Sequence, residues 1–393
     1  KADNNRILTI PESSIGLTID KWEELVPEPK DAVLTGFRPL QSRQLLLFYR
    51  QNSYSRADLL HIDTKKIVRV QLPKFVSISA SSSSVYTPDC FISYVGYTKP
   101  RAVGSLNCSD ASLRTIWEQT SLPGDEQLQT QQFWSTSADG TRVPYSLISR
   151  KDISTNRPSP TIIYVYGGFS SGLEPNYITN WRQWVLDGGV YIEGNIRGGD
   201  ECGKNWHQLA VKANKQKSFE DLKAIAEDVI KNGYTSSEML GATGGSNGGM
   251  VVSATAILYP DLFKAIASIV PLCDMFRFPK FLIASRWVHE YGDPSVKDEF
   301  KVISTWSPYH NVKSDVDYPS FYFYTADHDT RVHPLHARKM TALLQNSETS
   351  NIVMLRTSMG SGHTASNMTK EQQIKESAEK AAFFAQELGL NIP

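Results

Sequence analysis

The pattern of hydrophobic and polar residues changes once along this chain. Over about the first 117 residues, short runs of β-favouring residues alternate with clusters of turn-forming residues. This pattern predicts strands at residues 32–35, 45–49, 57–62, 66–71 and 90–95. Residues 121–126 are turn-rich, and beyond them strand-like runs alternate with longer helical patterns. The sequence therefore predicts two domains, at residues 1–120 and 121–393.

One unit of the first domain recurs 45 residues later. Residues 45–49 followed by Arg56-Ala57 correspond to residues 90–94 followed by Arg101-Ala102. A period near 45 with several strands per unit is typical of β-propeller blades, although two unrelated hairpins in a β-sandwich would give the same pattern. We expect the serine-rich residues 77–84 to be a solvated loop between the two units.

Two such units cannot close a propeller, which needs about four to eight blades. We therefore expect residues 1–120 to form a partial β-propeller of about two blades. Because lone blades would leave sheet edges unprotected, we also expect the chain to be the C-terminal portion of a longer protein.

The second domain alternates strands with helices. Residues 127–135 and 143–149 predict a hairpin, and the apolar stripe of residues 219–231 predicts a helix that stops at Gly233. Further strands are predicted at 161–166, 189–195, 263–270, 320–325 and 351–356, and further helices at 335–345 and 370–388. Such alternation predicts a mostly parallel, doubly wound sheet covered by helices on both faces.

The glycine-rich segment 244–249, Gly-Gly-Ser-Asn-Gly-Gly, lies between two apolar runs. So many glycines suit a sharp turn that brings a helix tightly against a strand, because a Cβ atom would clash at each close approach. Ser246 then lies at the apex, as in the G-x-S-x-G nucleophile elbow of the α/β-hydrolase fold. The sequence predicts that fold, with Ser246 as a candidate nucleophile; a glycine-rich turn that merely contains serine is the alternative.

A serine nucleophile needs an imidazole base and a carboxylate that orients the imidazole. In α/β-hydrolases the chain order is Ser, Asp, His, and the catalytic groups follow the carboxyl ends of strands. The predicted strand 320–325 runs into a loop with Asp327 and Asp329, and strand 351–356 runs into a loop that ends at His363. The spacing favours His363 as the base and leaves Asp327 and Asp329 open as the acid. We interpret His328, His333 and His336 as packing or solvated groups.

Composition restricts the remaining possibilities. With 41 basic and 41 acidic residues the formal net charge is zero, so nothing steers the chain toward nucleic acid or an anionic membrane. No apolar stretch approaches the ~18 residues of a membrane span. Four cysteines in so long a chain favour reduced thiols and a cytoplasmic location. We expect a monomer that needs no cofactor or metal.

Several motifs together resemble the prolyl oligopeptidase family of serine peptidases. They are Tyr-Gly-Gly-Phe at 166–169, Asn-Ile-Arg-Gly-Gly at 195–199, the elbow at 244–249, Trp287 with Tyr291-Gly292, and Asp-Thr-Arg-Val at 329–332. The resemblance is close over about residues 120 to 370 and looser before them. It implies an α/β-hydrolase domain capped by a propeller, and cleavage of short peptides on the carboxyl side of proline.

The resemblance also implies roles for individual residues. Ser246 would be the nucleophile, Asp329 the orienting acid and His363 the general base. The Asn247 backbone N–H and the Tyr166 hydroxyl would bind the oxyanion. A proline pocket would be formed by the residues that match the family's substrate-binding positions, namely Trp287, Phe169, Tyr291, Val332 and Arg331.

The sequence also departs from the family pattern. Thr330 stands where an aspartate is frequent, Asp200 replaces a glycine, and Thr364 follows the histidine in place of glycine. Because Asp200 and Thr364 could alter substrate entry, strict proline preference is less firmly indicated than hydrolase chemistry. The alternatives are an acyl-peptide hydrolase or esterase of the same fold, and an inactive truncated product that acts as a binding module.

Overall fold

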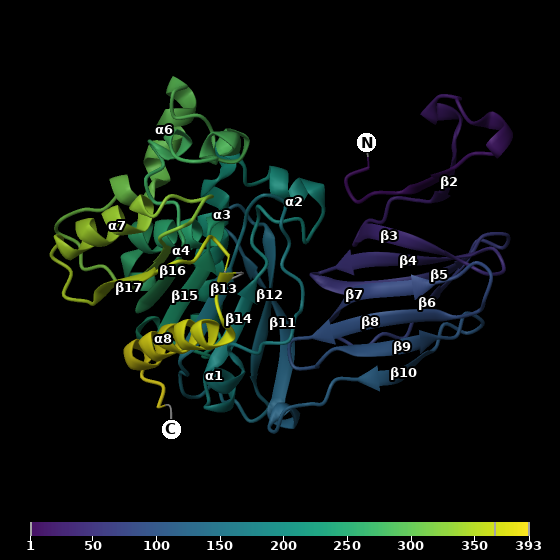
Figure 1. Cartoon of the computed structure of the whole chain (residues 1–393), viewed down its shortest axis with the longest axis horizontal. Coiled ribbons are helices and arrows are strands. Elements are labelled where there is room, and N and C mark those ends of the chain that lie inside the picture. Colours follow the sequence, from purple (N-terminus) through teal and green to yellow (C-terminus); the bar gives the residue numbers. More distant parts are fainter. Residues whose placement is uncertain (1, 365–366, 392–393) are drawn as a thin grey trace. The chain divides into compact units, whose positions relative to one another are not determined.

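The computed structural model describes residues 2–364 and 367–391 and divides the chain into two compact units (Figure 1). The first unit contains the chain up to Asp125 together with two short segments, residues 173–178 and 200–205. The second unit contains the rest of the chain. The two short segments were not foreseen, because the sequence pattern assigns them to loops of the second domain.

The first unit is built around two four-stranded antiparallel sheets, which form the partial β-propeller segment predicted from the repeat. In both sheets the four strands pair in sequence order. The repeated residues lie on the second and third strands of each sheet, except Arg101, which directly precedes the third strand of the second sheet. The strands are β3 (Val33–Leu40), β4 (Gln44–Gln51), β5 (Tyr54–His61) and β6 (Lys66–Arg69), then β7 (Val76–Ser83), β8 (Cys90–Gly96), β9 (Ala102–Leu106) and β10 (Leu113–Glu118).

The prediction of a solvated loop at residues 77–84 is wrong, because β7 covers most of this segment. Its backbone pairs with β8 from Val76 opposite Gly96 to Ser83 opposite Cys90. Ser77 is buried and donates a hydrogen bond of 2.6 Å to the Pro175 carbonyl. Serine-rich composition favours loops only where no partner strand is available, and here the ladder with β8 satisfies the backbone.

Polar contacts attach the two short segments to the strands of the first unit. The Arg50 guanidinium at the end of β4 lies 2.9 Å from a Glu174 carboxylate oxygen and 2.8 Å from one of Asp200. Since the Arg50 side chain is largely buried, these charge-assisted contacts act where water screens them little. Segments that the sequence pattern assigns to the second domain thus form part of the first unit.

The second unit contains a mixed sheet whose strand order is β11-β12-β14-β13-β15-β16-β17-β18. The first two strands form the predicted hairpin, and the strands from β14 to β18 run parallel. This mostly parallel sheet confirms the predicted α/β-hydrolase fold. The strands are β11 (Leu128–Thr136), β12 (Arg142–Arg150), β13 (Thr161–Val165), β14 (Val190–Gly194), β15 (Leu240–Gly245), β16 (Ala265–Ile269), β17 (Ser320–Ala326) and β18 (Val353–Ser358).

Helices cover both faces of this sheet (Figure 1). A Cβ atom on Gly241 of β15 would meet Phe384 of α8 (Lys370–Leu388), whereas one on Gly244 would meet Gly248 of α4 (Asn247–Leu258). Alternate positions of one strand therefore face the two helical layers. Helix α1 (Arg182–Leu186) packs with α8, and α3 (Gln216–Lys231) packs with α4.

The apolar stripe predicted for residues 219–231 is buried along α3, which begins three residues earlier than expected. Its first turn, Gln-Lys-Ser, is polar and so carries no hydrophobic signal. Helix α8 begins at the predicted residue, where Thr369 and Gln372 form a capping box, and it ends before Gly389 at φ 73°. The helices of ten residues or fewer in the second unit were missed, because a period is hard to recognise over so few residues.

Two adjacent glycines provide a direct test of the packing between β15 and α4. A Cβ atom on Gly244 would lie 2.5 Å from the backbone of Gly248 and 2.7 Å from the Val165 carbonyl oxygen, whereas a Cβ on Gly245 would meet nothing within 4 Å. We predict that Gly244→Ala lowers the free energy of unfolding by about 3 kcal/mol or more, because backbone atoms cannot move aside as a side chain can.

The matched control is Gly245→Ala, which should change stability by less than about 1 kcal/mol. Chemical denaturation of both variants measures the difference. Similar losses in the two variants would show that the close approach at Gly244 does not limit the packing.

Candidate active site

Ser246 lies at a sharp turn between the end of β15 and the start of α4. Its backbone has φ 54° and ψ −115°, a strained conformation for a residue with a side chain. The turn is held by the Ser246 N–H, which donates to the Ile269 carbonyl at 2.8 Å, and by the glycines that let α4 approach β13 and β15. This is the strand–turn–helix geometry of a nucleophile elbow.

His363 and Asp329 meet at the carboxyl edge of the sheet. The Nδ1 atom of His363 lies 2.7 Å from Oδ2 of Asp329, whose side chain is fully buried. The other oxygen, Oδ1, accepts from the backbone N–H groups of Arg331 and Val332 at 2.8 and 2.9 Å. The carboxylate is therefore fixed on both sides and accepts from Nδ1, which leaves Nε2 as the free nitrogen of the ring.

Of the two acids left open by the sequence, Asp329 is the one in contact with His363. Asp327 instead lies 2.9 Å from Nδ1 of the exposed His328 and accepts from the Gly360 N–H at 2.7 Å. Its contacts stabilise the two strand-end loops against each other.

The remaining histidines near the acid loop have packing contacts. The Nδ1 atom of His336 accepts from the N–H groups of Cys273 and Asp274, and burial lowers the pKa of His336 to about 4. The ring is therefore neutral at physiological pH, as an acceptor must be. His333 accepts from the Leu335 N–H at 3.1 Å.

Ser246 and His363 line the same cavity of about 540 Å³. Four other predicted site residues line the same cavity, together with direct neighbours of Ser246 and His363 and residues that the sequence did not single out. The full lining is Tyr166, Phe169, Gly245, Ser246, Ile269, Val270, Ile283, Trp287, Arg331, His363 and Thr364.

Tyr166 follows the last residue of β13. Burial and the nearby Glu290 carboxylate raise the pKa of its hydroxyl, which therefore stays protonated and able to donate a hydrogen bond. The Tyr166 carbonyl accepts from the side-chain amide of Asn247 at 2.6 Å. This bond ties the Tyr166 loop to the first residue of α4, where backbone N–H groups lack intrahelical acceptors.

Aromatic side chains form one wall of the cavity. The rings of Phe169 and Trp287 meet edge to face with their centroids 6.1 Å apart. Tyr291 also packs edge to face with Phe169, at a centroid distance of 5.7 Å, and its hydroxyl donates to the Asn247 side chain at 2.9 Å. Tyr291 and Val332 are both buried and are not among the residues that line the cavity. Tyr291 supports the wall through its contact with Phe169, whereas Val332 belongs to the apolar core of the second unit.

Ile269, Val270 and Ile283 are cavity residues that the sequence reasoning missed. Ile269 ends β16 and Val270 follows it, with φ 43° and an N–H that donates to the Tyr324 carbonyl at 2.7 Å. Both lie at the carboxyl end of the strand beside β15, so strand order could have identified them. Ile283 lies in an irregular segment with no such signal.

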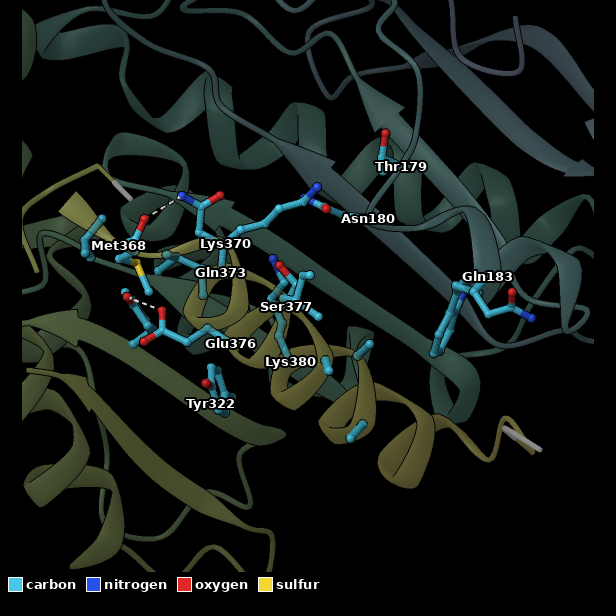
Figure 2. A pocket seen from close by; sticks show the side chains of 18 of the residues that line it. Thr179, Asn180, Gln183, Tyr322, Met368, Lys370, Gln373, Glu376, Ser377 and Lys380 are labelled. Atoms are coloured by element: carbon cyan, nitrogen blue, oxygen red, sulfur yellow. Dashed lines mark hydrogen bonds between the residues drawn. The ribbon is translucent and has the colours of Figure 1, made fainter. Parts of the chain in front are cut away.

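A second cavity of about 910 Å³ lies between α1 and α8 in the same unit, and Figure 2 shows the side chains around it. Ile269, Val270 and His363 line both cavities. Lys380 of α8 lies 5.1 Å from the centre of the Trp181 ring, and burial lowers its pKa to about 8.

Among the residues that the structure describes, no group of three His, Cys, Asp or Glu side chains could hold a metal ion. None of the helices in the same ranges combines the length and apolar character that crossing a membrane requires.

Comparison with known proteins matches both parts of the chain to one family. Residues 176–391 match the model of the prolyl oligopeptidase family, and residues 1–119 match the model of the N-terminal β-propeller domain of prolyl oligopeptidase.

Individual relatives agree with these matches. An uncharacterized peptidase of Sinorhizobium fredii is 40% identical over 71% of this chain and 38% of its own length. A prolyl endopeptidase of Elizabethkingia meningoseptica is 34% identical over 83% of this chain and 46% of its own length. A solved prolyl endopeptidase structure superposes with a TM-score of 0.91 at 33% identity, over 99% of this chain and 57% of that one.

The chain spans about half the length of the curated relatives it matches. The family model nevertheless covers more than half of the chain, including the elbow, the acid loop and His363. On these matches, together with the fold and the strand-end residues described above, the chain belongs to the prolyl oligopeptidase family, peptidase family S9.

Proposed function

We propose that this chain is a serine peptidase that hydrolyses short peptides on the carboxyl side of proline. One observation carries the proposal most strongly. His363, hydrogen-bonded at 2.7 Å to the buried Asp329, lines the same cavity as Ser246 on its strained turn. Nucleophile, base and orienting acid are thus supplied by three separate strand-end loops, as acyl transfer requires.

In the first half of the reaction, the Ser246 hydroxyl oxygen attacks the carbonyl carbon of the scissile bond. Its proton passes to Nε2 of His363, and Asp329 stabilises the imidazolium through Nδ1–H. The carbonyl oxygen becomes an oxyanion. When the C–N bond breaks, Nε2 gives the proton to the leaving amine, and an acyl ester on Ser246 remains.

In the second half, water attacks the ester carbon and its proton passes to Nε2 of His363. The ester C–O bond breaks, Ser246 recovers its proton, and the peptide leaves with a new carboxylate. The two oxyanions would be bound by the Asn247 backbone N–H and the Tyr166 hydroxyl. Asn247 begins α4, so the positive end of the helix dipole also stabilises the negative charge of the oxyanion.

The proline preference is supported by the shape of the aromatic wall and by the relatives. A pyrrolidine ring offers apolar faces and no N–H, which suits the Phe169 and Trp287 rings. Tyr291 and Val332 would hold this wall in place, and the exposed Arg331 could bind a substrate carbonyl upstream of proline. Several relatives of this chain are named prolyl endopeptidases or prolyl oligopeptidases.

The first test of this proposal is covalent labelling. We predict that a fluorophosphonate probe modifies Ser246, because only an activated serine attacks phosphorus rapidly. Peptide mass spectrometry locates the adduct. Ser246→Ala and His363→Ala should each lower kcat by about 10⁴-fold or more while the protein stays folded. An adduct on another serine would contradict the assignment of the nucleophile.

The second test concerns substrate preference. We predict that Trp287→Ala loses more kcat/KM on a proline dipeptide than on its alanine analogue, by about 2- to 10-fold, because ring stacking is worth about 0.5–1.5 kcal/mol beyond area burial. Fluorogenic proline, alanine and arginine dipeptides measure the preference. An N-acylated amino-acid substrate and a simple ester extend the panel to the acyl-peptide hydrolase and esterase alternatives.

The matched control is Trp134→Ala, a partly exposed tryptophan of β11 that does not line the cavity. Its proline-to-alanine ratio should equal that of the unmodified chain. If Trp287→Ala lowers kcat/KM equally on the proline and alanine substrates, Trp287 is part of the scaffold and does not select proline.

A further inference from the structure

A buried ion cluster lies behind the aromatic wall of the candidate active site. Lys215, just before α3, and Glu290, in α5 (Val288–Tyr291), have no exposed side-chain surface. The Lys215 ammonium lies 3.1 Å from Oε1 of Glu290 and donates to the Gly167 carbonyl at 2.9 Å. The partly buried His207 lies 2.7 Å from the other oxygen of Glu290 through Nε2.

Packing alone does not explain charged side chains at this buried position. Removing charges from water is expensive, and apolar side chains of similar volume are often as stable or more stable in such places. Burial raises the pKa of Glu290, but Lys215 and His207 oppose it and hold the pKa below its ordinary value. The carboxylate is therefore charged, and the pair is an ion pair that acts in a medium with little screening.

One contact of the cluster fixes the loop that carries Tyr166 and Phe169. Gly167 lies between these two residues, and its carbonyl is held by the Lys215 ammonium. The loop has positive φ values of 64° at Gly167, 57° at Phe169 and 54° at Ser170. Such a conformation persists only where the surroundings enforce it, and the Lys215 contact is one of those constraints.

The other contact fixes the opposite side of the wall. Glu290 lies directly before Tyr291, which packs on Phe169, and three residues after Trp287. A single buried ion pair thus links the Tyr166–Phe169 loop to the segment that carries Trp287. Among the hydrogen bonds of the described residues, none joins the side chain of Ser246, Asp329 or His363 to this cluster.

We propose that Lys215 and Glu290 are positioning residues: their ion pair sets the Tyr166–Phe169 loop against the Trp287–Tyr291 segment and thereby the selectivity of the cavity for proline. The proposal rests on the proposed function for the identity of the selected residue. It predicts that breaking the pair widens the gap between the Tyr166–Phe169 loop and the Trp287–Tyr291 segment. The preference for proline should then fall, because a misplacement of about 1 Å can cost about 100-fold in rate.

The test uses a single and a double variant, because Lys215→Met alone leaves the Glu290 charge buried and unpaired and can reduce stability. Lys215→Met combined with Glu290→Gln removes both charges and should recover most of that stability. It cannot restore the contact to the Gly167 carbonyl. We expect the double variant to lose about 10-fold or more of the proline-to-alanine kcat/KM ratio, although its melting temperature recovers.

Lys339→Met is the matched control. It removes the ammonium group that pairs with the buried Asp274, whose other charged neighbours are Arg277 and His310. None of these described residues belongs to the Tyr166–Phe169 loop or the Trp287–Tyr291 segment. Its proline-to-alanine ratio should stay unchanged. An unchanged ratio in the folded double variant, from a parent that prefers proline, would overturn the positioning role and leave the proposed function intact.

Hydrogen exchange provides a readout that does not depend on activity. In the double variant, amide protection should fall in residues 166–171 and 287–292 and remain unchanged around Asp329 and His363. The control should show no change in the first two segments. Unchanged protection there would overturn the proposal, whereas a parent that shows no proline preference would contradict the proposed function alone.

Discussion

The candidate site depends on a close backbone approach between β13, β15 and α4. Gly244 and Gly248 have no room for a Cβ atom, since it would lie within about 2.5 Å of backbone atoms of the neighbouring segment. This approach forces the chain through Ser246 in a positive-φ conformation and points the start of α4 at the cavity. Strain of this kind is tolerated because the large apolar core of the second unit surrounds it.

Around this turn, buried charges hold the loops that line the cavity. Arg197 has no exposed side-chain surface and donates to Asp221 of α3 and to the hairpin between β11 and β12. A Cβ atom on the neighbouring Gly198 would lie 2.2 Å from the Gly167 carbonyl oxygen, so the Arg197 loop packs directly against the Tyr166 loop. Lys215 and Glu290 hold the same loop from another side. The position of Tyr166 and Phe169 thus rests on two buried ionic clusters as well as on apolar packing.

Much of this arrangement could be predicted from sequence because it follows from local pattern. The glycines of residues 244–249 indicate the sharp turn, and the spacing of apolar residues indicates helix α3. His363 follows a predicted strand in the chain order expected for the base. The serine-rich strand β7 could not be predicted, since its structure comes from pairing with β8. The choice between Asp327 and Asp329 depends on the direction of two side chains two residues apart, which spacing does not determine. Lys215 and Glu290 lie 75 residues apart in the sequence, and from the sequence each would be predicted to be a solvated surface charge.

The most direct test of the account is the structure of this chain with a peptidyl-prolinal, an aldehyde that serine peptidases attack. We predict a covalent bond from the Ser246 oxygen to the aldehyde carbon. The resulting oxygen should lie about 2.7–3.1 Å from the Asn247 nitrogen and the Tyr166 hydroxyl, with the pyrrolidine ring against Phe169 and Trp287. An aldehyde bound without a bond to Ser246, or with its ring away from both aromatic side chains, would contradict the account.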